Sequence, residues 1–318
     1  MVPRGALDKS ISHILGGVMF STLGLWHLFN HIRLVVSLAP TSSYVAPAWF
    51  PAPRFRHLEL IVMLAAGVYG FATQMLAYSP MPFNTDGSIP PPERLPNHEH
   101  AIMYASLLVY AGSAIYLDRR RSSPHRHRHR HTTLCMLLLG AVFAQELFVF
   151  HVHSTDHAGV EGRLHWFLQA AAATCLATAL LGAASLPTEL QFAVSLVRSA
   201  SLAFQGLWGV VIGVTWIPGM APMGCSLDDD GVNLRCHGED SLRHAIAVVN
   251  LQFGWCFVLV TVSVLGLYVY VCRKYPDDGA GEVYGRLPEA EAADEDADMK
   301  TCNCKEEVHD FASMEIEV

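Results

Sequence analysis

Residues 133–153 read TLCMLLLGAVFAQELFVFHVH, an apolar run interrupted by a single acidic residue, Glu146. A helix of about 20 apolar residues is long enough to cross the hydrocarbon core of a bilayer. The chain contains seven runs of this kind. We therefore predict an all-α fold, a bundle of seven transmembrane helices. The predicted helices cover residues 11–32, 58–79, 100–118, 133–153, 164–184, 193–216 and 245–271.

The composition of the chain agrees with a membrane protein. Of its 318 residues, 52% are hydrophobic and only 16% are charged, which is too apolar for an ordinary soluble domain. Membrane lipids are therefore the first expected partner. The formal net charge of −8 comes mainly from acidic residues after position 275. The chain has no sustained basic surface, which argues against nucleic acid as a partner.

Basic residues in short loops predict the orientation, because such loops stay on the cytosolic side of a membrane. Three basic segments fall on one side of the predicted bundle: Arg33 to Arg56, Arg119 to His131, and Arg273 with Lys274. We therefore expect the N-terminus outside the cytosol and the C-terminus inside it. The chain then divides into a seven-span membrane domain, 1–275, and an acidic cytosolic tail, 276–318, whose composition predicts disorder.

The sixth predicted helix contains small and polar residues that predict how it packs. Gly206 permits close approach of another helix backbone. Arg198, near the start of the predicted span, could extend its charged head to the membrane surface. Arg198 and Gln205 are seven residues apart on one face, and they could instead meet Gln169 or Asn250 inside the bundle.

Two cysteines and a short tail motif carry expectations that depend on the orientation. Cys225 and Cys236 lie in a loop predicted to face an oxidising compartment, where they would form a disulfide. Two free thiols are the alternative. In the tail, Tyr284 and Leu287 fit the tyrosine-based pattern that cytosolic sorting adaptors bind.

Histidines gather at the predicted outer ends of the helices. Imidazole and carboxylate groups are ligands that zinc and iron accept, and several of them on adjacent helices would form a metal site. Glu146 belongs to this group because a carboxylate inside the hydrocarbon layer needs a proton, a partner or a metal. Interfacial histidines bonded to loop carbonyls and lipid headgroups are the alternative. The candidate ligands are His98, His100, Glu146, His151, His153, His157 and His165.

A second, smaller group of histidines is expected at the cytosolic ends of the first two helices. His27 and His31 are four residues apart and share one helix face, and His57 opens the second helix. These three imidazoles could bind an ion. Hydrogen bonds between helices explain the same residues without any ligand.

Four motifs occur in order along the chain: GLWHLFNH at 24–31, WFP at 49–51, FHVHSTDHAGVEG at 150–162 and FQGLW at 204–208. Together they resemble the plant branch of the transmembrane protein 45 family, which is also described as domain of unknown function 716. The similarity runs from about Ser12 to Tyr275. The resemblance implies a multi-pass protein of the plasma membrane or of Golgi-related endomembranes, with a role in trafficking or in stress and pathogen response. It supplies no catalytic residues.

These observations leave several functions open. The sequence contains no recognised catalytic motif, which together with the tail and the resemblance favours a non-enzymatic protein that acts through partners. A metal-dependent membrane enzyme is the alternative, with zinc or iron on the outer histidines and Glu146 or Glu161 as general base. A metal-ion or proton transporter and a carrier of two haem groups are further alternatives. The oligomeric state stays open.

Overall fold

The computed structural model describes residues 4–38, 44–78, 95–120, 126–157, 159–184, 186–228 and 233–275. The acidic tail lies outside these residues. The predicted disorder of that tail and its sorting motif, Tyr284 and Leu287, therefore stay predictions.

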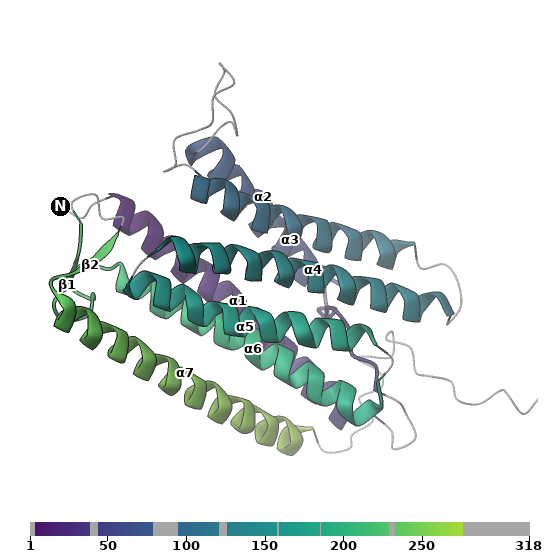
Figure 1. Cartoon of the computed structure of the whole chain (residues 1–318). Coiled ribbons are helices and arrows are strands. Elements are labelled where there is room, and N and C mark those ends of the chain that lie inside the picture. Colours follow the sequence, from purple (N-terminus) through teal and green to yellow (C-terminus); the bar gives the residue numbers. More distant parts are fainter. Residues whose placement is uncertain are drawn as a thin grey trace, which may run out of the picture.

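The described residues form seven helices that are each long and apolar enough to cross a membrane (Figure 1). The predicted seven helices are confirmed, whereas their orientation relative to the cytosol stays a prediction. The expectation that the whole stretch 119–131 is a loop is wrong, because a helix already begins at Arg126. In chain order the elements are α1 (Arg4–Val36), α2 (Leu58–Ala72), a π-helical turn (Thr73–Tyr78), α3 (Leu95–Arg119), α4 (Arg126–Asp156), α5 (Val160–Ala183), α6 (Thr188–Thr215), β1 (Cys225–Leu227), β2 (Leu234–Cys236) and α7 (Glu239–Lys274).

The bundle has two chemically different ends. The hairpin end carries strands β1 and β2 together with the starts of α1, α5 and α7 (Figure 1). The far end carries the segment before α2, with Arg56 and His57, which contacts Asp118 near the end of α3. Because the helices alternate in direction, the hairpin end also receives the last turn of α4.

A short β-hairpin closes the hairpin end. Strands β1 and β2 pair antiparallel with Cys225 opposite Cys236, and a disulfide joins these two residues. Leu234 of the hairpin is buried in a core cluster with Leu164 of α5 and Ala245 of α7. The hairpin therefore ties the ends of these helices together.

Helices α1 and α6 lie in backbone contact, and glycine makes this contact possible. A side chain at Gly24 would overlap the backbone of Ala203, and one at Gly206 would overlap the backbone of Ser21. Close approach of two helices at small residues is the usual way in which helices associate in lipid. The small residues expected in the sixth helix therefore pack against the first helix.

Helix α7 lies at the edge of the bundle (Figure 1). Its buried residues are Ala245, Val249 and Val271, whereas large apolar side chains such as Trp255 and Leu259 are exposed. Because a membrane surrounds such a helix with lipid tails, this apolar face needs no protein to cover it.

Candidate functional site

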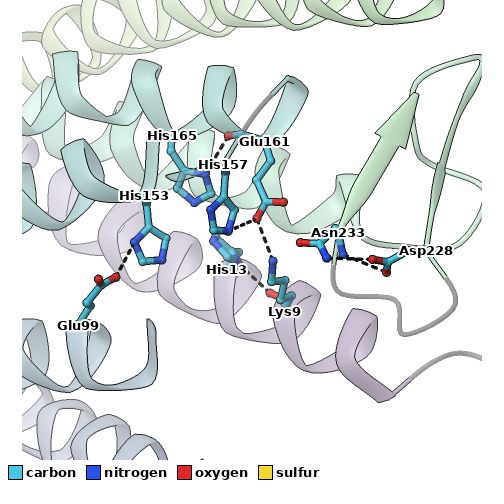
Figure 2. A network of polar contacts seen from close by, with 9 residues as sticks. All are labelled: Lys9, His13, Glu99, His153, His157, Glu161, His165, Asp228 and Asn233. Carbon is cyan, nitrogen blue, oxygen red and sulfur yellow. Dashed lines mark hydrogen bonds and ion pairs between the residues drawn. The ribbon is translucent and has the colours of Figure 1, made fainter. Parts of the chain in front are cut away.

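Five imidazole rings from four helices meet at the hairpin end. His153 of α4 is at the centre of the group, and its ring centroid lies 5.1 Å from that of His100 on α3. The centroids of His157 and His165 lie 5.6 Å and 5.5 Å from that of His153. His13 of α1 completes the group, with its ring centroid 5.9 Å from that of His165. We call these five residues the histidine cluster, and Figure 2 shows four of them.

Two carboxylates border the histidine cluster (Figure 2). The Oε1 atom of Glu161 accepts a hydrogen bond from Lys9 Nζ at 2.9 Å and lies 3.2 Å from Nε2 of His157. The Oε2 atom of Glu99 lies 2.9 Å from Nδ1 of His153. The cluster therefore contains five imidazoles and only two neighbouring carboxylates. The histidines also contact one another through their rings.

The sequence between α4 and α5 explains why these residues meet. His153 lies in the last turn of α4, and His157 directly follows the last residue of that helix, with its backbone N–H bonded to the backbone oxygen of His153. Gly159 then adopts a positive φ of 75°, which lets α5 begin immediately after the turn. Glu161 and His165 are four residues apart, and His165 Nδ1 lies 2.9 Å from the backbone oxygen of Glu161.

His13 belongs to the cluster, although it is not among the ligands predicted from the sequence. Its Nδ1 atom bonds to the backbone oxygen of Lys9 at 2.9 Å, and its ring stacks on Trp216 with a centroid distance of 6.0 Å. The available signal was its position near the start of the first predicted span, on the same side as the other outer histidines.

Three other predicted ligands have different surroundings. His151 is exposed, and its Nδ1 atom lies 3.2 Å from the side-chain oxygen of Gln169. Glu146 is buried with 3% exposure, its Oε2 atom has no hydrogen-bond partner, and its polar neighbour is Gln205. His98 is half-buried in the first turns of α3. Glu146 is thus an interior residue rather than a member of the cluster.

The donor atoms of the cluster do not point to one common centre. Within the described ranges, no three His, Cys, Asp or Glu side chains are arranged as ligands of a single metal ion. The rings instead bond to the two carboxylates and to backbone oxygens. Imidazole is chemically suited both to proton transfer and to metal binding, and binding one metal ion here would require the rings to rotate about their side-chain bonds.

The far end arranges its histidines differently, beginning with the buried carboxylate of Glu59. His27 Nε2 lies 2.7 Å from Glu59 Oε1. Trp26 Nε1 and the backbone N–H of Phe50 both donate to Glu59 Oε2 at 3.0 Å. Three donors therefore surround one carboxylate, which satisfies it without a metal.

The remaining far-end histidines also have partners of their own. His31 Nδ1 lies 2.6 Å from the hydroxyl of Tyr44, and His57 Nε2 lies 2.8 Å from Asp118. Asp118 accepts two further bonds from Arg56 at 2.8 and 2.9 Å, which raises the pKa of Arg56. Burial raises the pKa of the Tyr44 phenol. This pairing favours the structural hydrogen bonds that the sequence left as the alternative to an inner metal site.

Comparison with known proteins agrees with the resemblance noted from the motifs. Residues 132–269 match the model of a family of unknown function, DUF716. The matched segment includes His153, His157 and His165 but not the two cluster residues on α1 and α3. No curated protein matches the chain. A place in the plant branch stays a prediction.

Proposed function

The family whose model matches residues 132–269, DUF716, is of unknown function, so we propose the function of this chain from the histidine cluster. We propose a multi-pass membrane protein that binds one divalent transition-metal ion, zinc or iron, at the hairpin end. The observation that carries the proposal is the packing of five imidazoles from α1, α3, α4 and α5 around His153.

The spacing of the rings supports a metal. Imidazoles that share one tetrahedral zinc ion have ring centres roughly 5 Å apart, because each ligating nitrogen lies about 2.0–2.1 Å from the metal. The three centroid distances from His153 are 5.1, 5.5 and 5.6 Å, which is close to this value. Binding therefore requires rotation of side chains rather than movement of helices.

The electrostatics of the site also support a cation. Glu161 and Glu99 place two carboxylates beside the rings, where they can complete a ligand set or orient an imidazole. Lys9 donates a hydrogen bond to Glu161 Oε1 in this structure. A metal ion bound to that carboxylate oxygen would displace the ammonium group of Lys9. Release of Lys9 is thus part of the proposed binding step.

We propose a binding role for the ion rather than a catalytic one. An ion shared by histidines of α3, α4 and α5 would hold three helix ends in one arrangement, and partners can respond to that arrangement. This agrees with a role through partners in endomembrane trafficking or stress response, which the resemblance implies. A metal-dependent enzyme or an ion transporter at the same histidines is the alternative, and an activity or flux assay on reconstituted protein would favour it.

The test compares two histidines that are two residues apart on α4. Detergent-purified wild type, His153→Ala and His151→Ala are each loaded with zinc, dialysed and measured by plasma mass spectrometry. We expect about one zinc ion per chain in wild type and in His151→Ala, and loss of zinc in His153→Ala. Zinc-free wild type, or equal zinc in both variants, would refute the proposal.

A further inference from the structure

Arg198 is a buried cation that forms no ion pair with any of the described residues. It lies on α6 with 3% exposure, roughly 15 Å along the helix from Thr188, where α6 begins. Its Nη1 atom donates to the backbone oxygen of Thr178 at 3.3 Å, whereas Nη2 has no hydrogen-bond partner. Among the residues the structure describes, no carboxylate lies within ion-pair distance of this guanidinium.

The neighbours of Arg198 are neutral polar groups. The contacts of Gly24 with Ala203 and of Gly206 with Ser21 fix an antiparallel α1–α6 register that brings His31 to the turn of α6 that holds Arg198. The hydroxyl of Tyr44 bonds to His31 Nδ1 at 2.6 Å. His31 is completely buried, and its Nε2 atom also has no hydrogen-bond partner. Gly182 lies against the guanidinium, because a side chain at this glycine would come within 2.9 Å of Arg198 Nη1. Two orphaned nitrogen atoms, one from α1 and one from α6, therefore lie in one polar region of the interior.

None of the buried carboxylates among the described residues, Glu59, Glu146 and Glu161, forms an ion pair with Arg198. Glu59 already holds His27, Trp26 and the backbone of Phe50. Glu146 has Gln205 as its polar neighbour. Either carboxylate, Glu59 or Glu146, could therefore neutralise Arg198 only by moving away from its present neighbours.

An arginine keeps its charge in a protein interior, so it needs a partner of opposite charge there. The guanidinium is planar and suits bidentate binding of carboxylate and phosphate groups. We propose that Arg198 and His31 bind one oxyanion, a carboxylate or a phosphate, inside the bundle. Such a group reaches this site either as the head of a membrane lipid or fatty acid or as a free anion.

The test measures thermal unfolding of purified protein in a nonionic detergent with oleate, phosphatidate or inorganic phosphate. Wild type is compared with Arg198→Met and with Arg163→Met, a control on α5 whose Nε donates to Asn250. We expect at least one anion to raise the Tm of wild type and Arg163→Met by on the order of 5 °C, and Arg198→Met not to respond. A response to oleate or phosphatidate alone identifies a lipid source, and a response to phosphate identifies a free anion.

Two outcomes would overturn the proposal: no anion shifts wild type, or Arg198→Met responds as wild type does. If Arg198→Met fails to fold, His31→Phe takes its place, and a full response of that variant counts against the site. The experiment contains no transition metal, so it is independent of the histidine cluster.

Discussion

The histidine cluster at the hairpin end and the histidines at the far end are built from the same side chains on adjacent helices, but their surroundings differ. At the far end each imidazole bonds to its own partner: His27 to Glu59, His31 to Tyr44 and His57 to Asp118. At the hairpin end the rings contact one another around His153.

The difference lies in the supply of acceptors. The far end offers Glu59 and Asp118, and each carboxylate is surrounded by several donors. Buried polar groups that are fully bonded in this way hold a structure in place. At the hairpin end five imidazoles lie beside two carboxylates, Glu99 and Glu161, and imidazole is a group that binds metal ions and protons. Clusters that look alike in sequence therefore separate into one group whose carboxylates are surrounded by donors and one group whose imidazole rings contact one another.

The largest expected effect tests the group whose carboxylates are surrounded by donors. Glu59→Leu leaves the N–H groups of Trp26 and Phe50 and the ring of His27 without an acceptor in a buried site. We expect the free energy of unfolding to fall by about 3–5 kcal/mol, measured by denaturation in mixed micelles. Glu99→Leu is the matched variant at the hairpin end, where the carboxylate side chain is 29% exposed, and it should cost less than about 1 kcal/mol without metal. Equal costs would abolish the distinction between the two ends.

A smaller effect is expected from the disulfide, which occurs only at the hairpin end of the described chain. Cys225 and Cys236 are 11 residues apart, and removing a crosslink that closes a loop of this size costs about 3 kcal/mol. We expect Cys236→Ser to speed hydrogen exchange in the first turns of α5 and α7 and to leave Trp26 and His27 protected. Cys272→Ser, which changes a free cysteine on α7, is the control. Faster exchange at both ends would show that the ends are not independent.

The sequence predicted the helices well because membrane spans depend on local composition. It predicted the interior poorly because helix pairing depends on neighbours that are distant in sequence. The hypothesis that Arg198 reaches the membrane surface is wrong, since α6 begins at Thr188 and places this residue almost three turns inside the bundle. The alternative contact of Arg198 and Gln205 with Gln169 or Asn250 is also wrong, because Gln169 bonds to Ser154 and Asn250 to Arg163.

The histidines predicted to lie at the outer ends of the helices show the same limit at the level of single residues. Topology alone placed His151 and His153 on one side of the membrane, but only the packing of α4 separates the exposed residue from the buried one. His13 was missed because its ring meets the cluster through the α1 and α6 contact. That contact depends on glycines whose partner helix cannot be read from one sequence.

The smallest expected effect concerns Lys9, a cation that lies beside the histidine cluster. Its ammonium group bonds to Glu161 Oε1 beside the rings of the cluster, where it competes with a divalent cation for the carboxylate. We expect Lys9→Met to raise zinc affinity about fivefold, equivalent to about 1 kcal/mol, in a competition titration with a fluorescent chelator. Lys274→Met at the far end should leave the affinity unchanged. A lower affinity in Lys9→Met would mean that Lys9 supports the cluster instead of competing with the metal, and Glu161 would then be a helix contact rather than a ligand.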